Sequence, residues 1–114
     1  MRQESELLLD ILESIQHIEK YAAQGRENFK NNELVQSWFV RHLQIIGEAA
    51  RKLPAEFKER HPEVPWTKII GMRHILVHQY FEIDVDLVWT LVEHHLPQLK
   101  RQIEVMRKGL VKSP

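Results

Sequence analysis

Apolar residues recur along most of this chain at intervals of three and four, the spacing of α-helices that bury one face. The pattern runs through four stretches, residues 5–24, 32–53, 65–81 and 85–110. Residues 54–60 can add one or two helical turns, because Pro54 suits a first helical position. Strand-like alternation of useful length does not occur. We therefore expect an all-α fold, an antiparallel helical bundle of four to five helices that forms one domain over residues 1–114.

Turn and capping residues mark the expected ends of the first two helices. Gly25 is placed to end the first helix in a left-handed conformation. Residues 26–30 are then expected to be a short connector, and Asn31 or Asn32 can cap the second helix.

The last helix has a clear start and an expected interruption. Asp84 can cap its first turn. Pro97 lies inside the apolar pattern, and proline cannot donate a backbone hydrogen bond and clashes with the carbonyl four residues earlier. The sequence therefore predicts a kink near Glu93.

The apolar stripe of the second helix is wider than one contact face requires. The stripe comprises Leu34, Val35, Trp38, Phe39, Leu43, Ile45, Ile46, Ala49, Ala50 and Leu53, with His42 at its margin. Such width favours burial on two sides, by the bundle and by a second copy of the chain. His17 and Tyr21 lie off the stripe of the first helix, which favours a surface position or a partner contact.

Gly47 and Glu48 stand out within the second helix. Gly47 costs the helix about 1 kcal/mol relative to alanine, which favours close approach by another helix. Glu48 is a carboxylate in an apolar neighbourhood and is expected to need a cationic partner, for which Arg41 and Arg73 are the candidates. The alternative is a solvated Glu48 on the outer face.

Composition limits the possible functions. Sixteen basic and sixteen acidic side chains balance, which argues against a non-specific grip on nucleic acid, and no DNA partner is expected. The last fifteen residues lean basic, so a nucleic-acid contact would be local or made by an oligomer. The chain has no cysteine, which excludes disulfides and thiol chemistry. We expect no membrane span and no signal peptide, and hence a cytoplasmic protein.

Residues 73–80 concentrate the reactive side chains of the molecule. Arg73, His74, His78 and Tyr80 fall within eight residues, separated largely by aliphatic side chains. Arginine presents a fork of donors that suits phosphate oxygens, and histidine can take or give a proton near neutral pH. RNA carries its own nucleophile, the 2′-hydroxyl. Its cleavage needs a base, an acid and a cation, all of which this segment offers without a metal ion.

Helical geometry complicates that interpretation. Arg73 and His78 are five residues apart, and at about 100° per residue they lie about 140° apart around an undistorted helix. Either the helix breaks before His78, or a second copy of the segment completes the site. Two facing segments in a homodimer would place two arginines and two histidines around one cleft.

Two other interpretations of the segment stay open. His74 and His78 have the i, i+4 spacing of metal ligands, but the chain offers no evident third ligand nearby, and we expect no metal and no cofactor. On composition alone, the histidines and Tyr80 are as easily the polar edge of a buried helix.

The spacing Arg-X4-His-X-Tyr at Arg73, His78 and Tyr80 resembles the motif of the HepT family of HEPN-domain ribonuclease toxins. The surroundings agree over roughly residues 5–107. The agreeing segments are Ile46-Gly47-Glu48-Ala49, Pro65-Trp66, Gly71-Met72-Arg73 and the stretch from Phe81 to Trp89.

The resemblance implies a dimeric HEPN-like bundle whose motif segments line a shared cleft. It implies a metal-independent endoribonuclease that leaves a 2′,3′-cyclic phosphate. Arg73 would hold the scissile phosphate, and His78 would be the general acid or base, with His74 and Glu48 in support. It also implies an MntA-like nucleotidyltransferase antitoxin, with the Tyr80 hydroxyl as the acceptor of AMP. The added charge and bulk would block the phosphate site.

Two non-catalytic alternatives are also consistent with the sequence. HEPN-like domains can bind nucleotides, or act as adaptor partners of a nucleotidyltransferase, without cutting RNA. The neutral net charge favours this alternative, and the intact Arg73 and His78 pair argues against it. A helical adaptor that only pairs subunits would explain a dimer and would leave the motif unexplained.

Overall fold

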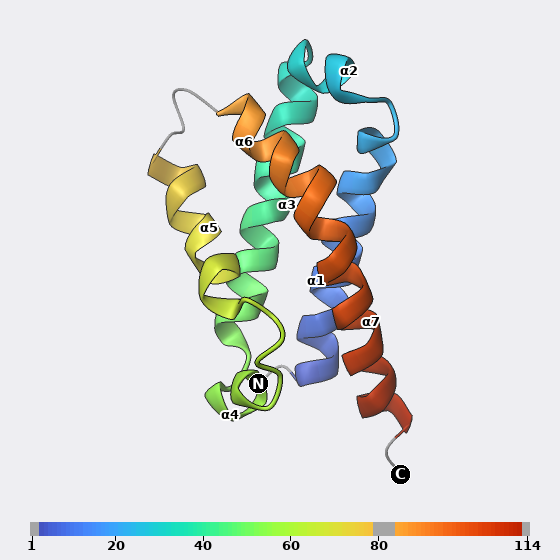
Figure 1. The fold of residues 1–114 in the computed structure, drawn as a ribbon, viewed down its shortest axis with the longest axis vertical. Helices are drawn as coiled ribbons and strands as arrows, with labels where there is room; N and C mark the ends of the chain where they lie inside the picture. The colour runs from blue at the N-terminus through green and yellow to red at the C-terminus, as the bar shows by residue number, and fades with distance from the viewer. Residues whose placement is uncertain (1–2, 79–83, 113–114) are drawn as a thin grey trace.

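The computed structural model describes residues 3–78 and 84–112, and for residues 73–78 and 111–112 it describes the backbone. The described residues form an all-α bundle without strands, as the sequence predicts. The chain runs up the bundle in α1 (Glu4–Ala22), down in α3 (Glu33–Lys52) and up in α5 (Trp66–His78) (Figure 1). It returns through α6 (Val85–Thr90), the π-helical turn η1 (Leu91–His95) and α7 (Leu96–Lys112). None of the described helices is long and apolar enough to cross a lipid bilayer.

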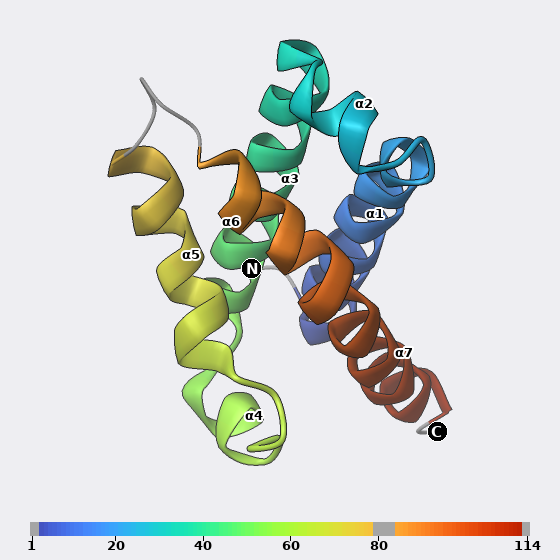
Figure 2. The same ribbon diagram turned by 45° about the horizontal axis from the view of Figure 1, so that its top comes forward.

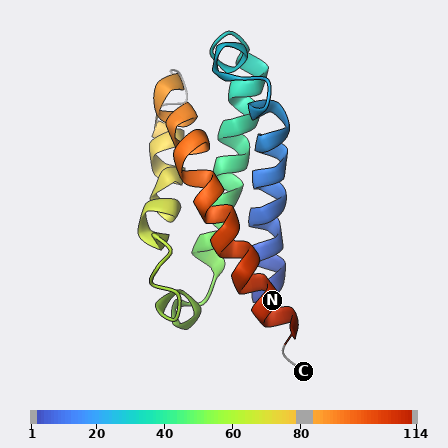
Figure 3. The ribbon, with the colours of Figure 1, turned by 45° about the vertical axis from the view of Figure 1, so that its right-hand side comes forward.

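The core gathers along α3, which packs against α1 on one side and α5 on the other. α7 crosses diagonally over the bundle and packs on α1 (Figure 3). The largest fully buried side chains are Phe29, Phe39, Phe57, Leu8, Ile11, Ile15, Ile18, Leu43, Ile46, Ile103 and Val88. These two neighbours cover most of the wide apolar stripe of α3 within one chain, and Leu34 at its start is exposed. The width alone therefore does not require a second subunit.

A short helix lies where the sequence predicts a connector. Residues 26–30 form α2 (Arg26–Lys30), which follows Gly25. Gly25 has φ +95° and ψ 167°, a conformation that L side chains rarely adopt, and it precedes α2 rather than capping α1. Phe29 anchors the turn, because its ring stacks on Phe39 with centroids 4.8 Å apart. The buried Gln36 amide donates to the carbonyls of Phe29 and Lys30 at 2.9 and 3.0 Å.

The predicted caps of α3 and α6 are confirmed. The Asn32 side chain accepts a hydrogen bond from the backbone N–H of Val35 at 3.2 Å. Asp84 accepts one from the N–H of Leu87 at 3.0 Å. Each satisfies a donor that the first turn of a helix leaves unpaired.

The interruption predicted before Pro97 is confirmed as a π-turn. In η1 the backbone N–H of Leu96 reaches back to the carbonyl of Leu91. Wider turns of this kind occur where the regular i, i+4 ladder is disturbed, and Pro97 supplies no N–H to that ladder. Figure 2 shows α6 and α7 following each other across this turn.

Candidate active segment

α5 continues as an unbroken α-helix through His78. The first of the two alternatives for the motif, a helix that breaks before His78, is therefore wrong. On this continuous helix, positions 73 and 78 lie about 140° apart. One copy of α5 does not place the two positions on one face.

The first half of α5 is fixed firmly in the core. Trp66 is buried, and its Nε1 donates to the carbonyl of His61 at 3.0 Å, which anchors the preceding loop. Ile69 and Met72 are also buried. Because Met72 directly precedes Arg73, the core holds the backbone at the position where the motif begins.

Several of the predicted site residues lie outside the part that the structure describes. Tyr80 is outside the described residues altogether. Arg73, His74 and His78 have described backbone in α5 and no described side chains. The roles assigned to these four residues therefore stay predictions.

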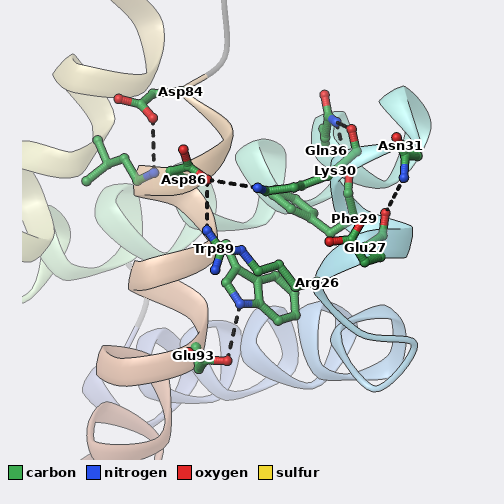
Figure 4. Close-up of polar contacts among 11 residues, drawn as sticks. Arg26, Glu27, Phe29, Lys30, Asn31, Gln36, Asp84, Asp86, Trp89 and Glu93 are labelled. Atoms are coloured by element: carbon green, nitrogen blue, oxygen red, sulfur yellow. Dashed lines mark hydrogen bonds and ion pairs between the residues drawn. The ribbon is translucent and has the colours of Figure 1, made fainter.

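The chain after the motif is anchored by polar contacts at the start of α6 (Figure 4). The Asp86 carboxylate accepts from Arg26 at 3.0 Å and lies 3.6 Å from the Lys30 ammonium. The hydrogen bond from Arg26 and the charge of Lys30 lower the pKa of Asp86. Trp89 is buried and donates to Glu93 at 3.2 Å. The contacts of Asp86 tie α6 to α2, and the Trp89 hydrogen bond joins α6 to η1.

Two cations on the same helix contact Glu48. Its Oε1 lies 2.7 Å from Arg51 Nη2 and 3.9 Å from Lys52 Nζ. A cationic partner is confirmed in Arg51 and Lys52, which were not among the candidates. The side chain of Arg73 lies outside the described part, so its pairing with Glu48 stays a prediction. Partners at i+3 and i+4 are neighbours on a helix surface, and this spacing could have pointed to them. The supporting role of Glu48 in catalysis stays a prediction.

Among the described side chains, no three histidines, aspartates or glutamates gather closely enough to hold a metal ion. The side chains of His74 and His78 are not among them, so a metal site at these two residues is not tested.

The Ribonuclease HepT-like family model matches residues 11–106, which include the whole Arg-X4-His-X-Tyr segment. The chain belongs to this family. A Thermococcus cleftensis protein named "Probable ribonuclease HepT" is 39% identical over 108 residues, covering 94% of this chain and 98% of that protein. An "mRNA nuclease HepT" from Shewanella oneidensis is 40% identical over 40 residues, covering 35% of this chain and 30% of that protein. No solved structure matches this chain significantly.

This HepT-like chain also holds a histidine cluster between α1 and α3 that the sequence pattern did not reveal. The His42 ring is buried and stacks on His17, with centroids 4.8 Å apart. Its Nδ1 lies 3.2 Å from Ser14 Oγ. Burial first, and then the nearby His17 and Arg41, lower the pKa of His42. The one signal in the sequence was the marginal place of His42 on its stripe.

Trp38 completes the cluster. Its indole N–H donates to the carbonyl of His17 at 3.0 Å, and its ring lies edge-on to His42 at 4.4 Å. Tyr21 meets Trp38 edge-on at 6.0 Å. His17 is exposed, as its off-stripe position predicts, and Tyr21 is half-buried, and both contact Trp38 within the chain.

Proposed function

We propose that this chain is a metal-independent endoribonuclease, and the toxin of a toxin–antitoxin pair. The observation that carries the proposal is the family match over residues 11–106 with Arg73, His78 and Tyr80 in the motif spacing. The Shewanella oneidensis relative is named an mRNA nuclease, which supports RNA as the substrate class.

The proposed reaction is a transesterification within RNA. One histidine takes the proton of a ribose 2′-hydroxyl, whose oxygen attacks the adjacent phosphorus. The bond from phosphorus to the 5′-oxygen breaks, and an acid protonates that leaving oxygen. The products are a 2′,3′-cyclic phosphate and a free 5′-hydroxyl. Arg73 would stabilise the charge on the phosphorane oxygens through paired hydrogen bonds.

We further propose that the active unit is a homodimer. The support is the continuous helix of α5, which separates positions 73 and 78 by about 140°. A cleft between two copies of α5 lets Arg73 of one copy act with His78 of the other. Such a shared cleft is an isologous contact, in which the same patch of both subunits meets around a two-fold axis.

Regulation is proposed to fall on Tyr80. A nucleotidyltransferase antitoxin would transfer AMP to the tyrosine hydroxyl, two residues after His78. The phosphate of AMP would add negative charge beside the groups that bind RNA phosphate and would repel the substrate.

The test is cleavage of total tRNA and of mRNA by purified protein in the presence of EDTA. Removing the phosphate clamp or the proton-transfer group acts on the transition state, so Arg73→Ala and His78→Ala should each lower the rate by about a hundredfold or more. Fragments from the unaltered protein should end in cyclic phosphate. Arg41→Ala and His94→Ala, which change exposed residues on α3 and η1, should cleave at the normal rate.

Cleavage that survives both motif substitutions would refute this site. A requirement for divalent metal would favour a metal site at His74 and His78 instead. If the unaltered protein cuts no RNA but still binds a nucleotidyltransferase, it is a non-catalytic HEPN module. Circular dichroism of each variant separates loss of chemistry from loss of fold.

A further inference from the structure

A groove lies at the end of the bundle formed by α4 (Ala55–Glu59), the loop after it and the last turns of α7. Its volume is about 630 Å³. In Figure 1 this end lies at the bottom, whereas the C-terminal end of α5 lies at the top. The groove is therefore at the opposite end of the bundle from the C-terminal end of α5.

The floor and one wall of the groove are apolar. Phe57 and Met106 close the floor and are almost fully buried. Val105 stands on the wall with 71% of its surface exposed, and Leu110 continues the wall toward the end of α7. An exposed β-branched side chain beside a hollow of this size is a surface that gains stability when a partner covers it.

The rim is built from charged side chains on both sides. Arg60 comes from the end of α4, and its guanidinium carbon lies 5.7 Å from the centre of the Phe57 ring. Arg101 faces the groove from α7 and is exposed. The carboxylate of Glu63 lies 3.4 Å from His61 Nδ1. Arg60 and Arg101 thus lie on either side of the apolar groove, and the Glu63 carboxylate is next to His61.

Hydrogen bonds hold the loop at residues 61–63, which lines the groove, in place. Gln102 of α7 donates from its side-chain amide to the carbonyl of Glu63 at 3.2 Å. Trp66 holds the same loop through the carbonyl of His61. A groove whose walls are fixed in advance costs a ligand less ordering on binding.

The lining fits a protein segment better than an RNA strand. Single-stranded RNA needs exposed aromatic faces on which bases stack, and Phe57 is only 1% exposed. An amphipathic protein segment instead matches an apolar hollow flanked by cations.

We propose that this groove binds a short segment of a partner protein that carries an apolar side chain between carboxylates. The apolar side chain would lie against Val105, Met106 and Leu110, and the carboxylates would face Arg60 and Arg101. Charge complementarity with the two arginines is what selects an acidic partner.

The experiment uses the full chain and synthetic peptides with a leucine or phenylalanine between aspartates and glutamates. Nuclear magnetic resonance of labelled protein should show shifts at Arg60, Arg101 and Val105. Arg101→Glu should weaken the peptide by about tenfold or more, because a like charge replaces an attractive one. Lys108→Glu is the matched control, since it makes the same charge change on α7 outside the groove.

Gly109 offers a second, steric test. A Cβ added there meets nothing within 4 Å, so the backbone at this position accepts a side chain. Gly109→Trp should fill the groove and abolish peptide binding, whereas Gly109→Ala should preserve it. Thermal melts of both variants check that the fold is intact.

Three results would overturn the proposal. The first is that no acidic, apolar peptide shifts the groove resonances at millimolar concentration. The second is that binding persists unchanged in both Arg101→Glu and Gly109→Trp. The third is that a single-stranded RNA oligonucleotide binds the groove in place of the peptides, with the same loss in Arg101→Glu. RNA cleavage by Arg101→Glu stays normal under the proposal, so its failure and that of the ribonuclease assignment are distinguishable.

Discussion

His42 shows how a single buried side chain can make the stability of this bundle depend on pH. Its folded-state pKa lies below the ordinary value of 6.5. The unfolded chain therefore binds more protons than the folded chain at mildly acidic pH, and folding stability falls there. The stabilising contribution is complete above pH 6.5 and is lost as the pH falls through the folded pKa.

The measurement is chemical denaturation at about pH 8 and about pH 5, which lie on either side of the ordinary histidine pKa of 6.5. The free energy of unfolding should drop between the two, and His42→Gln should show a smaller drop because it removes the titrating ring. His17→Gln, which leaves the buried ring in place, should keep most of the drop. An equal drop in the unaltered protein and in His42→Gln would show that other groups control the pH dependence.

Tyr80 carries a prediction of its own. Co-expression with a cognate nucleotidyltransferase should increase the intact mass by one or more AMP groups. Tyr80→Phe lacks the acceptor oxygen and should keep the unmodified mass, whereas Tyr21→Phe should still be modified. Mass spectrometry reads the result directly, and an unmodified mass for the unaltered protein would refute the assignment.

At the scale of single residues, the sequence shows which reactive side chains are present. It does not show which residues contact each other in the fold. The Arg-X4-His-X-Tyr spacing is visible in eight consecutive letters. The contact between Ser14 and His42 joins residues 28 positions apart, on different helices, and no local pattern signals it. The ion pair of Glu48 with Arg51 is local, but the apolar neighbours of Glu48 in the sequence favoured a partner from farther away.

Among the helices, the cap of α6 is the contact most open to a quantitative test. Asp84→Ala removes the acceptor for the Leu87 N–H and should lower the free energy of unfolding by about 1 kcal/mol. Asp84→Asn keeps a capping oxygen and should change the stability much less. Urea denaturation of the three proteins checks this. Equal stability of Asp84→Ala and the unaltered chain would mean that the cap bond does not contribute.

Helices were predictable where they are long and poorly predictable where they are short. α1 and α3 show several turns of apolar spacing, and their buried residues follow that spacing. α2 has five residues, too few to show a period. Its position depends on Phe29 packing against Phe39 and Trp89, which come from distant parts of the chain.

For the whole molecule, the decisive question is which copies supply the catalytic groups. If Arg73 of one subunit acts with His78 of the other, then mixing Arg73→Ala with His78→Ala rebuilds one complete site in each mixed dimer. Random mixing makes about half of the dimers mixed, so the activity should return to about a quarter of the normal value. RNA cleavage by the co-refolded mixture measures this, with each variant refolded alone as control.

A mixture as inactive as its components would place both groups in one subunit.

The sequence favoured a dimer on two observations, and only one of them still supports a dimer. Most of the wide stripe of α3 is covered within one chain by α1 and α5, with Leu34 exposed. The angular separation of positions 73 and 78 remains, because α5 stays helical. Overall topology was predictable from sequence because four long amphipathic segments with short connections have few ways to pack.

The π-turn at Leu91–His95 bears on how this chain tolerates insertions and deletions. A π-turn bonds each N–H to the carbonyl five residues earlier, so it holds one residue more than an α-helical turn. Loss of one residue there, together with Pro97→Ala, would let the helix run regularly from α6 into α7 and keep Val88 and Leu99 in register. The same loss elsewhere in α7 would rotate every following core side chain by about 100°. This turn is therefore the place where the length of the last helix can vary at least cost to the core.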